Sequence, residues 1–109
     1  MAIDRTSWLE DLVKLNVPIS TIEAALKNME WDSDVALVTL RVADVRSVLD
    51  RYASGELSDQ DIERWANLIE GREDIELEES AKEPLFELAN PELTQHLSKA
   101  RAFDLLSKL

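Results

Sequence analysis

The sequence predicts a mainly α-helical single domain, in which a bundle of about five helices surrounds one core. Three observations support this fold class. The chain has 109 residues, which is enough for one domain over residues 1–109 and leaves no room for a second. Only two glycines and three prolines are present, too few for a fold built from strands and tight turns. Apolar residues recur at spacings of three and four over several stretches, as on the buried face of a helix.

Two short helices are expected on either side of Pro18. The first ends near Asn16, because the residue before a proline is biased away from the helical conformation. Its apolar residues are Trp8, Leu9, Leu12, Val13 and Leu15. Ser20 and Glu23 have the spacing of a capping box, which places the start of the second helix near Ser20. Its apolar face contains Ile19, Ile22, Leu26 and Met29.

Two stretches have the character of short strands. Residues 35–42 (VALVTLRV) are apolar and β-branched and lack a helical period, which is typical of a strand or of a buried connector. Residues 72–79 (REDIELEE) alternate Ile75 and Leu77 with charged residues. A period of two indicates a strand, even though glutamate is a poor strand former. A short two-stranded β element beside the helices is therefore an optional part of the fold.

The firmest local prediction is a helical hairpin over residues 43–70. Its first helix ends at Gly55, which can adopt the left-handed conformation of a helix C-terminus. Ser58 and Asp61 have the spacing of an N-cap for the second helix, whose first turn is acidic as the helix dipole favours. The buried stripe of that helix consists of Ile62, Trp65, Ala66 and Ile69. Gly71 closes it.

Two further helices are expected in the C-terminal quarter. Pro84 permits a short helix that runs through Ala89. Asn90 then caps a last helix with Pro91 in its first position, where the missing N–H of proline costs no hydrogen bond. The segment 84–109 carries 3 acids and 3 bases, so this helix is part of a neutral region. Its apolar stripe is formed by Leu93, Leu97, Ala100 and Phe103 and extended by Leu106 and Leu109.

Charge is the compositional feature that bears most on function. The chain has 23 acidic and 12 basic residues, a net charge of −11, and residues 56–83 account for most of the excess with 11 acids and 3 bases. This balance argues against binding to a nucleic-acid backbone or an anionic membrane surface, because contacts with phosphates need Lys and Arg. The chain has no run of about 18 apolar residues and no basic N-terminus followed by an apolar stretch. We therefore expect a cytoplasmic protein with no membrane contact.

The sequence lacks the motifs that would indicate catalysis, a cofactor or a metal. There is no cysteine, and neither a glycine-rich nucleotide loop nor the G-x-S-x-G elbow of hydrolases occurs. Loops that begin at Asp32 or Asp59 fail the residue spacing of an EF-hand. His96 is the single histidine, and an ion pair with Glu92 on one helix face explains both residues. We expect a protein that is not an enzyme and binds no cofactor or metal.

The candidate site is an acidic surface for a basic partner protein. Concentrated charge steers an oppositely charged protein and raises its association rate. A solvated face without a binding role is the alternative. The expected partner-binding residues are Glu73, Asp74, Glu76, Glu78 and Glu79, with Trp31 as an anchor at the edge. Trp65 is expected in the core, whereas Trp8 and Trp31, near helix ends, are either partly buried caps or exposed anchors.

Four short motifs carry a resemblance to a known family. A Gly-Glu-Leu-Ser turn begins at Gly55, a Trp-Ala-Asn triplet at Trp65, an Arg-x-Asp-Ile segment at Arg72 and an Ala-Asn-Pro helix start at Ala89. In this combination the C-terminal half resembles a family of small uncharacterised bacterial proteins, which implies no activity. The chain is more loosely similar to the acidic helical immunity proteins that neutralise nuclease toxins, with which it shares size, charge and helical content.

Together these observations favour a non-enzymatic protein-binding module, and in its specific form an immunity-type inhibitor of a basic, toxin-like protein. A preorganised acidic surface suits this role, because a nuclease presents cationic side chains to nucleic acid. The alternative is a structural or regulatory homo-oligomer, such as a homodimer, that assembles through the neutral, apolar C-terminal helix.

Overall fold

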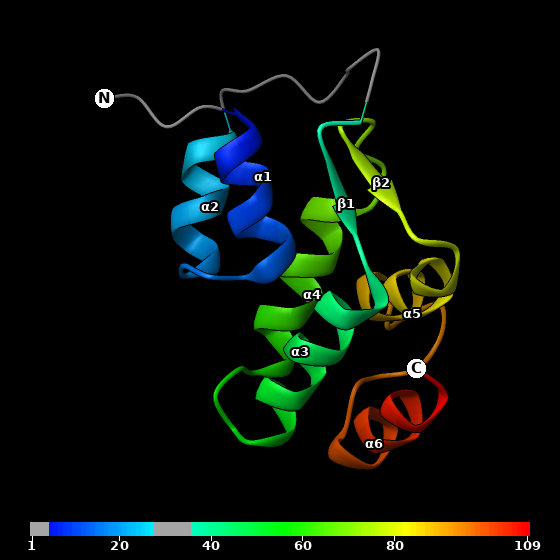
Figure 1. Cartoon of the computed structure of the whole chain (residues 1–109). Coiled ribbons are helices and arrows are strands. Elements are labelled where there is room, and N and C mark those ends of the chain that lie inside the picture. Colours follow the sequence, from blue (N-terminus) through cyan, green and yellow to red (C-terminus); the bar gives the residue numbers. More distant parts are fainter. Residues whose placement is uncertain (1–4, 28–35) are drawn as a thin grey trace.

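The computed structural model describes residues 5–27 and 36–109, and in them the chain is mainly helical (Figure 1). Within these residues there are six helices and two short strands. The helices are α1 (Arg5–Lys14), α2 (Ile19–Leu26), α3 (Val42–Ala53), α4 (Asp59–Ile69), α5 (Glu79–Ala89) and α6 (Lys99–Lys108), and the strands are β1 (Val38–Leu40) and β2 (Ile75–Leu77). The mainly α fold class, with a short strand pair, is thereby confirmed. No helix of these two segments is long and apolar enough to cross a bilayer.

Helix α4 lies in the middle of the molecule. It packs against α1 and α2 on one side and against α5 on the other, and α6 packs against α3 (Figure 1). Trp65 of α4 is fully buried, and its indole Nε1 donates a hydrogen bond of 2.7 Å to the carbonyl of Leu12 in α1. This confirms the prediction that Trp65 belongs to the core. Trp8 is partly buried against the same core, whereas Trp31 and Met29 lie outside the described residues.

Helices α1 and α2 are present as expected, but α2 begins one residue earlier than Ser20. Pro18 occupies the N-cap position, and its carbonyl accepts hydrogen bonds from the N–H groups of Thr21 and Ile22. The predicted capping box of Ser20 and Glu23 is therefore wrong. Since the fixed φ of proline already orients the chain for helix entry, Ser20 falls inside the first turn rather than before it.

The two strands form a parallel pair in which Val38 lies opposite Ile75 and Leu40 opposite Leu77. Parallel neighbours need a crossover connection, and α3 and α4 provide it. Hydrogen bonds from Leu37 N to Asp74 O (2.8 Å) and from Glu78 N to Leu40 O (2.9 Å) extend the pairing beyond the strand ends. The optional β element is confirmed; Val35, at the start of the expected first strand, lies outside the described part of the chain.

The helical hairpin is also confirmed, as α3 followed by α4. Gly55 (φ 87°) and Gly71 (φ 84°) both adopt the left-handed conformation that ends a helix. At the start of α4, Asp61 N donates to Ser58 Oγ at 3.1 Å and Ser58 N donates to Asp61 Oδ2 at 2.9 Å, which completes a capping box.

The C-terminal quarter departs from the prediction in two places. Helix α5 begins at Glu79, so Pro84 lies within the helix rather than at its start. Four buried residues supply an apolar face that holds α5 despite the hydrogen bond that the proline removes: Ala81, Leu85, Leu88 and Ala89. Residues 91–98 are not helical, and the last helix begins only after Ser98, whose Oγ accepts a hydrogen bond of 3.1 Å from Arg101 N. The helix start at Asn90 and Pro91 was therefore predicted wrongly.

Candidate functional site

The segment from Glu73 to Glu79 lies between the end of α4 and the start of α5, and β2 forms its middle. Glu73 and Glu76 are exposed, because they point to the solvent side while Asp74 and Ile75 point inward. Glu79, in the first turn of α5, has an 88% exposed side chain. The structure thus presents three of the predicted carboxylates to solvent. Trp31, the predicted anchor, lies outside the described residues.

Asp74 does not belong to this surface. Its side chain is 0% exposed and forms hydrogen bonds with two arginines. Arg72 Nε reaches Asp74 Oδ1 at 2.9 Å, and Arg5 Nε reaches Asp74 Oδ2 at 2.9 Å. Burial by itself raises the pKa of Asp74, but the hydrogen bonds from Arg72 and Arg5 outweigh burial and hold that pKa below its ordinary value. The prediction that Asp74 binds a partner is therefore corrected, because a partner cannot reach this carboxylate.

The buried cluster of Asp74, Arg72 and Arg5 instead joins distant parts of the fold. Arg5 lies in the first turn of α1, 69 residues before Asp74. The backbone carbonyl of Asp74 accepts hydrogen bonds from Leu37 N and Val38 N at the start of β1. One residue thereby connects α1, β1 and the segment before β2, and so fixes the position of the exposed carboxylates on either side of it.

Glu78 is intermediate in exposure between the solvent-exposed glutamates and the buried Asp74. Its Oε1 accepts a hydrogen bond of 3.2 Å from Val42 N, the first N–H of α3, and its Oε2 lies 4.0 Å from Arg41 Nη1. The side chain is half-exposed and its charge is partly compensated. Glu79 pairs with Lys82 at 3.0 Å on the surface of α5, a solvent-exposed contact that contributes little to stability.

The acidic excess of residues 56–83 remains largely uncompensated in the folded protein. All three cations of this segment are already engaged, Arg64 with Glu23, Arg72 with Asp74 and Lys82 with Glu79. Among the residues that the structure describes, seven of the segment's carboxylates form no ion pair: Asp59, Asp61, Glu63, Glu70, Glu73, Glu76 and Glu83. Glu63 and Glu83 were not predicted as site residues, although each lies on the polar side of a helix, where a helical period could have revealed it.

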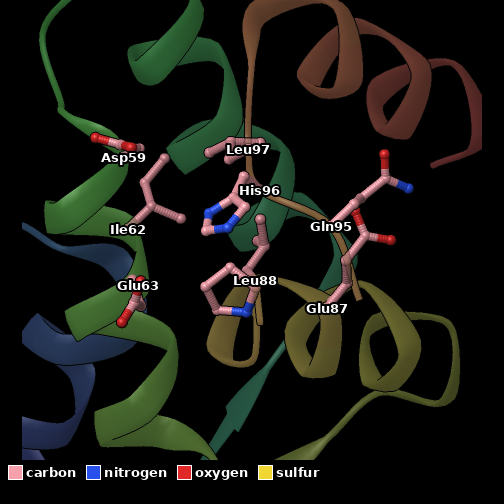
Figure 2. Close-up of a pocket in the computed structure, with 9 residues that line it drawn as sticks. Asp59, Ile62, Glu63, Glu87, Leu88, Gln95, His96 and Leu97 are labelled. Atoms are coloured by element: carbon pink, nitrogen blue, oxygen red, sulfur yellow. The ribbon is translucent and has the colours of Figure 1, made fainter. Parts of the chain in front are cut away.

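A small hollow lies beside His96 (Figure 2). The imidazole points into it, with Ile62 of α4 and Leu88 of α5 next to the ring. The hollow measures about 20 Å³, which is close to the space that one water molecule needs. It is too small for a substrate. Since residues 91–98 are not helical, the predicted ion pair on one helix face does not form, and no hydrogen bond or ion pair joins His96 to Glu92 in the described structure.

A larger groove, of about 390 Å³, lies between the α1–α2 connection and the α3–α4 connection. Val17, Pro18 and Leu57 contribute its apolar surface. Its two cations are already paired, Arg51 with Glu56 and Arg64 with Glu23, so the groove offers no unpaired cation to an anionic ligand. Within residues 5–27 and 36–109, no group of three His, Asp or Glu side chains is placed to hold a metal ion.

Helix α6, part of the expected interface of a homo-oligomer, buries some of its apolar side chains within the chain and leaves others exposed. Ala102 and Leu105 are buried, and α6 packs against α3. Leu106 and Leu109 are partly buried against the core, whereas Phe103 stays 62% exposed. A bidentate ion pair between Arg101 and Glu87 of α5 also holds α6 in place, with Arg101 Nε to Glu87 Oε2 at 2.7 Å.

No protein-family model, curated protein or solved structure matches this chain. The two resemblances drawn from the sequence motifs and from size and charge therefore stay predictions.

Proposed function

We propose that this protein is a non-enzymatic binding module for a basic protein, and that in its specific form it is an immunity-type inhibitor of a toxin-like partner. One observation carries the proposal. Seven carboxylates of residues 56–83 form no ion pair among the described residues, while every cation of that segment is already engaged. An incoming protein with Lys and Arg on its surface would meet carboxylates that form no ion pair with the described part of the chain.

The exposed carboxylates are also held in a defined arrangement. Glu73 and Glu76 lie on either side of the buried Asp74, and Glu79 begins α5 directly after β2. Because β2 carries Glu76, α5 carries Glu79 and the hydrogen-bonded Asp74 fixes the turn that carries Glu73, a partner does not have to order the backbone below these groups, which lowers the entropic cost of association. Clustered charge of one sign also steers a partner of opposite sign and raises the association rate.

The inhibitor form of the proposal follows from the chemistry of the partner class. A protein that binds a nucleic-acid backbone presents Lys and Arg at a spacing that fits phosphates. A fixed array of carboxylates competes for the same side chains. The net charge of −11 keeps the inhibitor itself away from nucleic acid.

The test is a pull-down from a lysate of the source cells at low and moderate salt, read by mass spectrometry. The native bait is compared with a Glu73→Gln/Glu76→Gln/Glu79→Gln bait. A control bait changes three exposed or half-exposed acids outside the segment, Glu10→Gln/Asp11→Asn/Asp50→Asn, and therefore alters the net charge equally.

We expect the native and control baits to capture one basic protein in stoichiometric amount, and the first variant to lose it at moderate salt. Equal capture by all three baits would remove this surface from consideration. Recovery of the chain only with itself would replace the proposal by the homo-oligomer.

A further inference from the structure

Two large apolar side chains are exposed at the C-terminal end of α5 and in the turn that follows it. Leu93 is 76% exposed and Phe86 is 48% exposed. Phe86 lies one helical turn before Asn90 on the same side of α5, and Leu93 lies in the turn that follows Asn90. An exposed apolar side chain of this size offers contact area to a partner.

The turn that carries Leu93 is fixed by Asn90. The Nδ2 of Asn90 donates to Phe86 O at 2.9 Å and to the Glu70 carboxylate at 3.1 Å, so it joins the end of α5 to the end of α4. Leu93 N donates to Asn90 O at 3.1 Å, and Thr94 Oγ1 donates to the same carbonyl at 2.8 Å. Leu93 is therefore exposed on an ordered turn and not at a loose end of the chain.

A shallow hollow of about 360 Å³ opens between α4 and this turn. Ala89, Pro91 and Leu93 give it an apolar surface, and Glu63 of α4 and Glu92 of the turn add carboxylates. Figure 2 shows Glu63 projecting from α4. Both glutamates are exposed, and neither forms an ion pair within the described part of the chain. The hollow thus combines apolar contact area with uncompensated negative charge.

Lysine and arginine side chains have a complementary construction. Their aliphatic stems pack on apolar surface, and their cationic heads reach beyond it to a carboxylate. We propose that this hollow receives a lysine or arginine side chain of a basic partner protein, and that an apolar residue beside that cation packs on Leu93. This inference rests on the proposed function, because both require a basic partner, and it adds the place and chemistry of an anchor.

Charge argues against a second copy of this chain as the occupant. A symmetric contact through this surface would bring the Glu63 and Glu92 carboxylates of both copies together without a cation between them. A partner that supplies Lys or Arg neutralises the same groups.

The experiment titrates the ¹⁵N-labelled protein with two synthetic peptides of equal positive charge and length. In one, lysines alternate with serine and glycine. In the other, lysines and leucines are spaced so that they form one cationic and one apolar face of a helix. Three proteins are compared: the native chain, Leu93→Ser/Glu63→Gln, and the matched control Phe103→Ser/Glu10→Gln. The control also removes one exposed apolar side chain and one acid, but at other places on the surface.

We expect the amphipathic peptide to bind the native chain and the control about tenfold more tightly than the lysine–serine peptide. Its shift changes should centre on residues 86–93, and Leu93→Ser/Glu63→Gln should lose the tenfold advantage while it still binds the lysine–serine peptide. Since both substituted side chains are exposed, unchanged circular dichroism and amide shifts elsewhere show that the variants are folded.

Two results would overturn the inference in distinguishable ways. If the double variant binds both peptides as the native chain does, the anchor is wrong but charge attraction to a basic partner stands. If neither peptide binds the native chain, the anchor is wrong and the attraction on which the proposed function rests is lost as well.

Discussion

Asp74 lies buried between Arg5 and Arg72, whereas Glu73 and Glu76, one and two positions away, project into solvent and form no ion pair with the residues that the structure describes. The three carboxylates belong to one short segment and carry the same charge. Burial and pairing make Asp74 part of the framework, because an ionised group inside a protein must be compensated by its neighbours. The two glutamates have no such role in the fold, and so they are the groups that a partner can use.

The largest expected effect on stability follows from removing the charge of the buried Asp74. Asp74→Asn leaves Arg72 buried beside an amide, and we expect the free energy of unfolding to fall by about 3–5 kcal/mol. Glu73→Gln, the matched change at the exposed neighbour, should stay within about 0.5 kcal/mol of the native protein. Urea unfolding of the two variants measures both values, and equal destabilisation by the two substitutions would contradict the distinction drawn here.

The pH dependence of stability provides a second test of the role of the buried Asp74. The pKa of Asp74 is lowered in the folded state, so the folded protein holds this proton more weakly than the unfolded chain does. The stabilisation by Asp74 is therefore fully present above its unfolded pKa of about 3.9, and it is lost as the pH falls through the lower folded value.

The difference in unfolding free energy between the native protein and Asp74→Asn should be constant from about pH 5 to 7 and shrink below about pH 4. Urea titrations over this range test the sign. A difference that grows on acidification would show that the folded pKa is raised instead.

Glu87 and Arg101 provide an intermediate case. Both side chains are largely buried at the α5–α6 contact, and the hydrogen bond from Arg101 to Glu87 is the main cause of the raised pKa of Arg101. We expect Glu87→Gln to cost about 1–2 kcal/mol, less than the change at Asp74 and more than a surface ion pair. In the Glu87→Gln variant, the backbone amides of α6 should exchange their hydrogens faster than those of α4. Equal protection of the two helices in native protein and variant would contradict this ranking.

Local sequence signals predicted the parts of the fold that depend on neighbouring residues. The Ser58–Asp61 capping box, the two helix-ending glycines and the alternation around Ile75 all lie within a few residues of the structure they determine. The parallel direction of the strand pair could not be predicted from local sequence, because it depends on how α3 and α4 carry the chain back to β1.

The incorrect predictions concern residues with partners that lie far away in the chain. Asn90 and Pro91 have the residue types of a helix start, but Asn90 is used to end α5, where its side chain reaches Glu70 twenty residues away. Asp74 was predicted to be a surface acid although one of its partners, Arg72, is only two residues away; its other partner, Arg5, is 69 residues away in the chain. Long-range partners of this kind leave no local pattern, and the burial of one acid in a row of acids follows only from the folded structure.

The central claim is that the exposed carboxylates beside Asp74 serve a basic partner. It is tested most directly by the association rate of the captured basic protein, measured over a range of ionic strength. The native chain should associate fastest at low salt and slow steeply as salt rises, whereas Glu73→Gln/Glu76→Gln/Glu79→Gln should start slower and show a flatter dependence. Identical rates and identical salt dependence for the two proteins would contradict the claim.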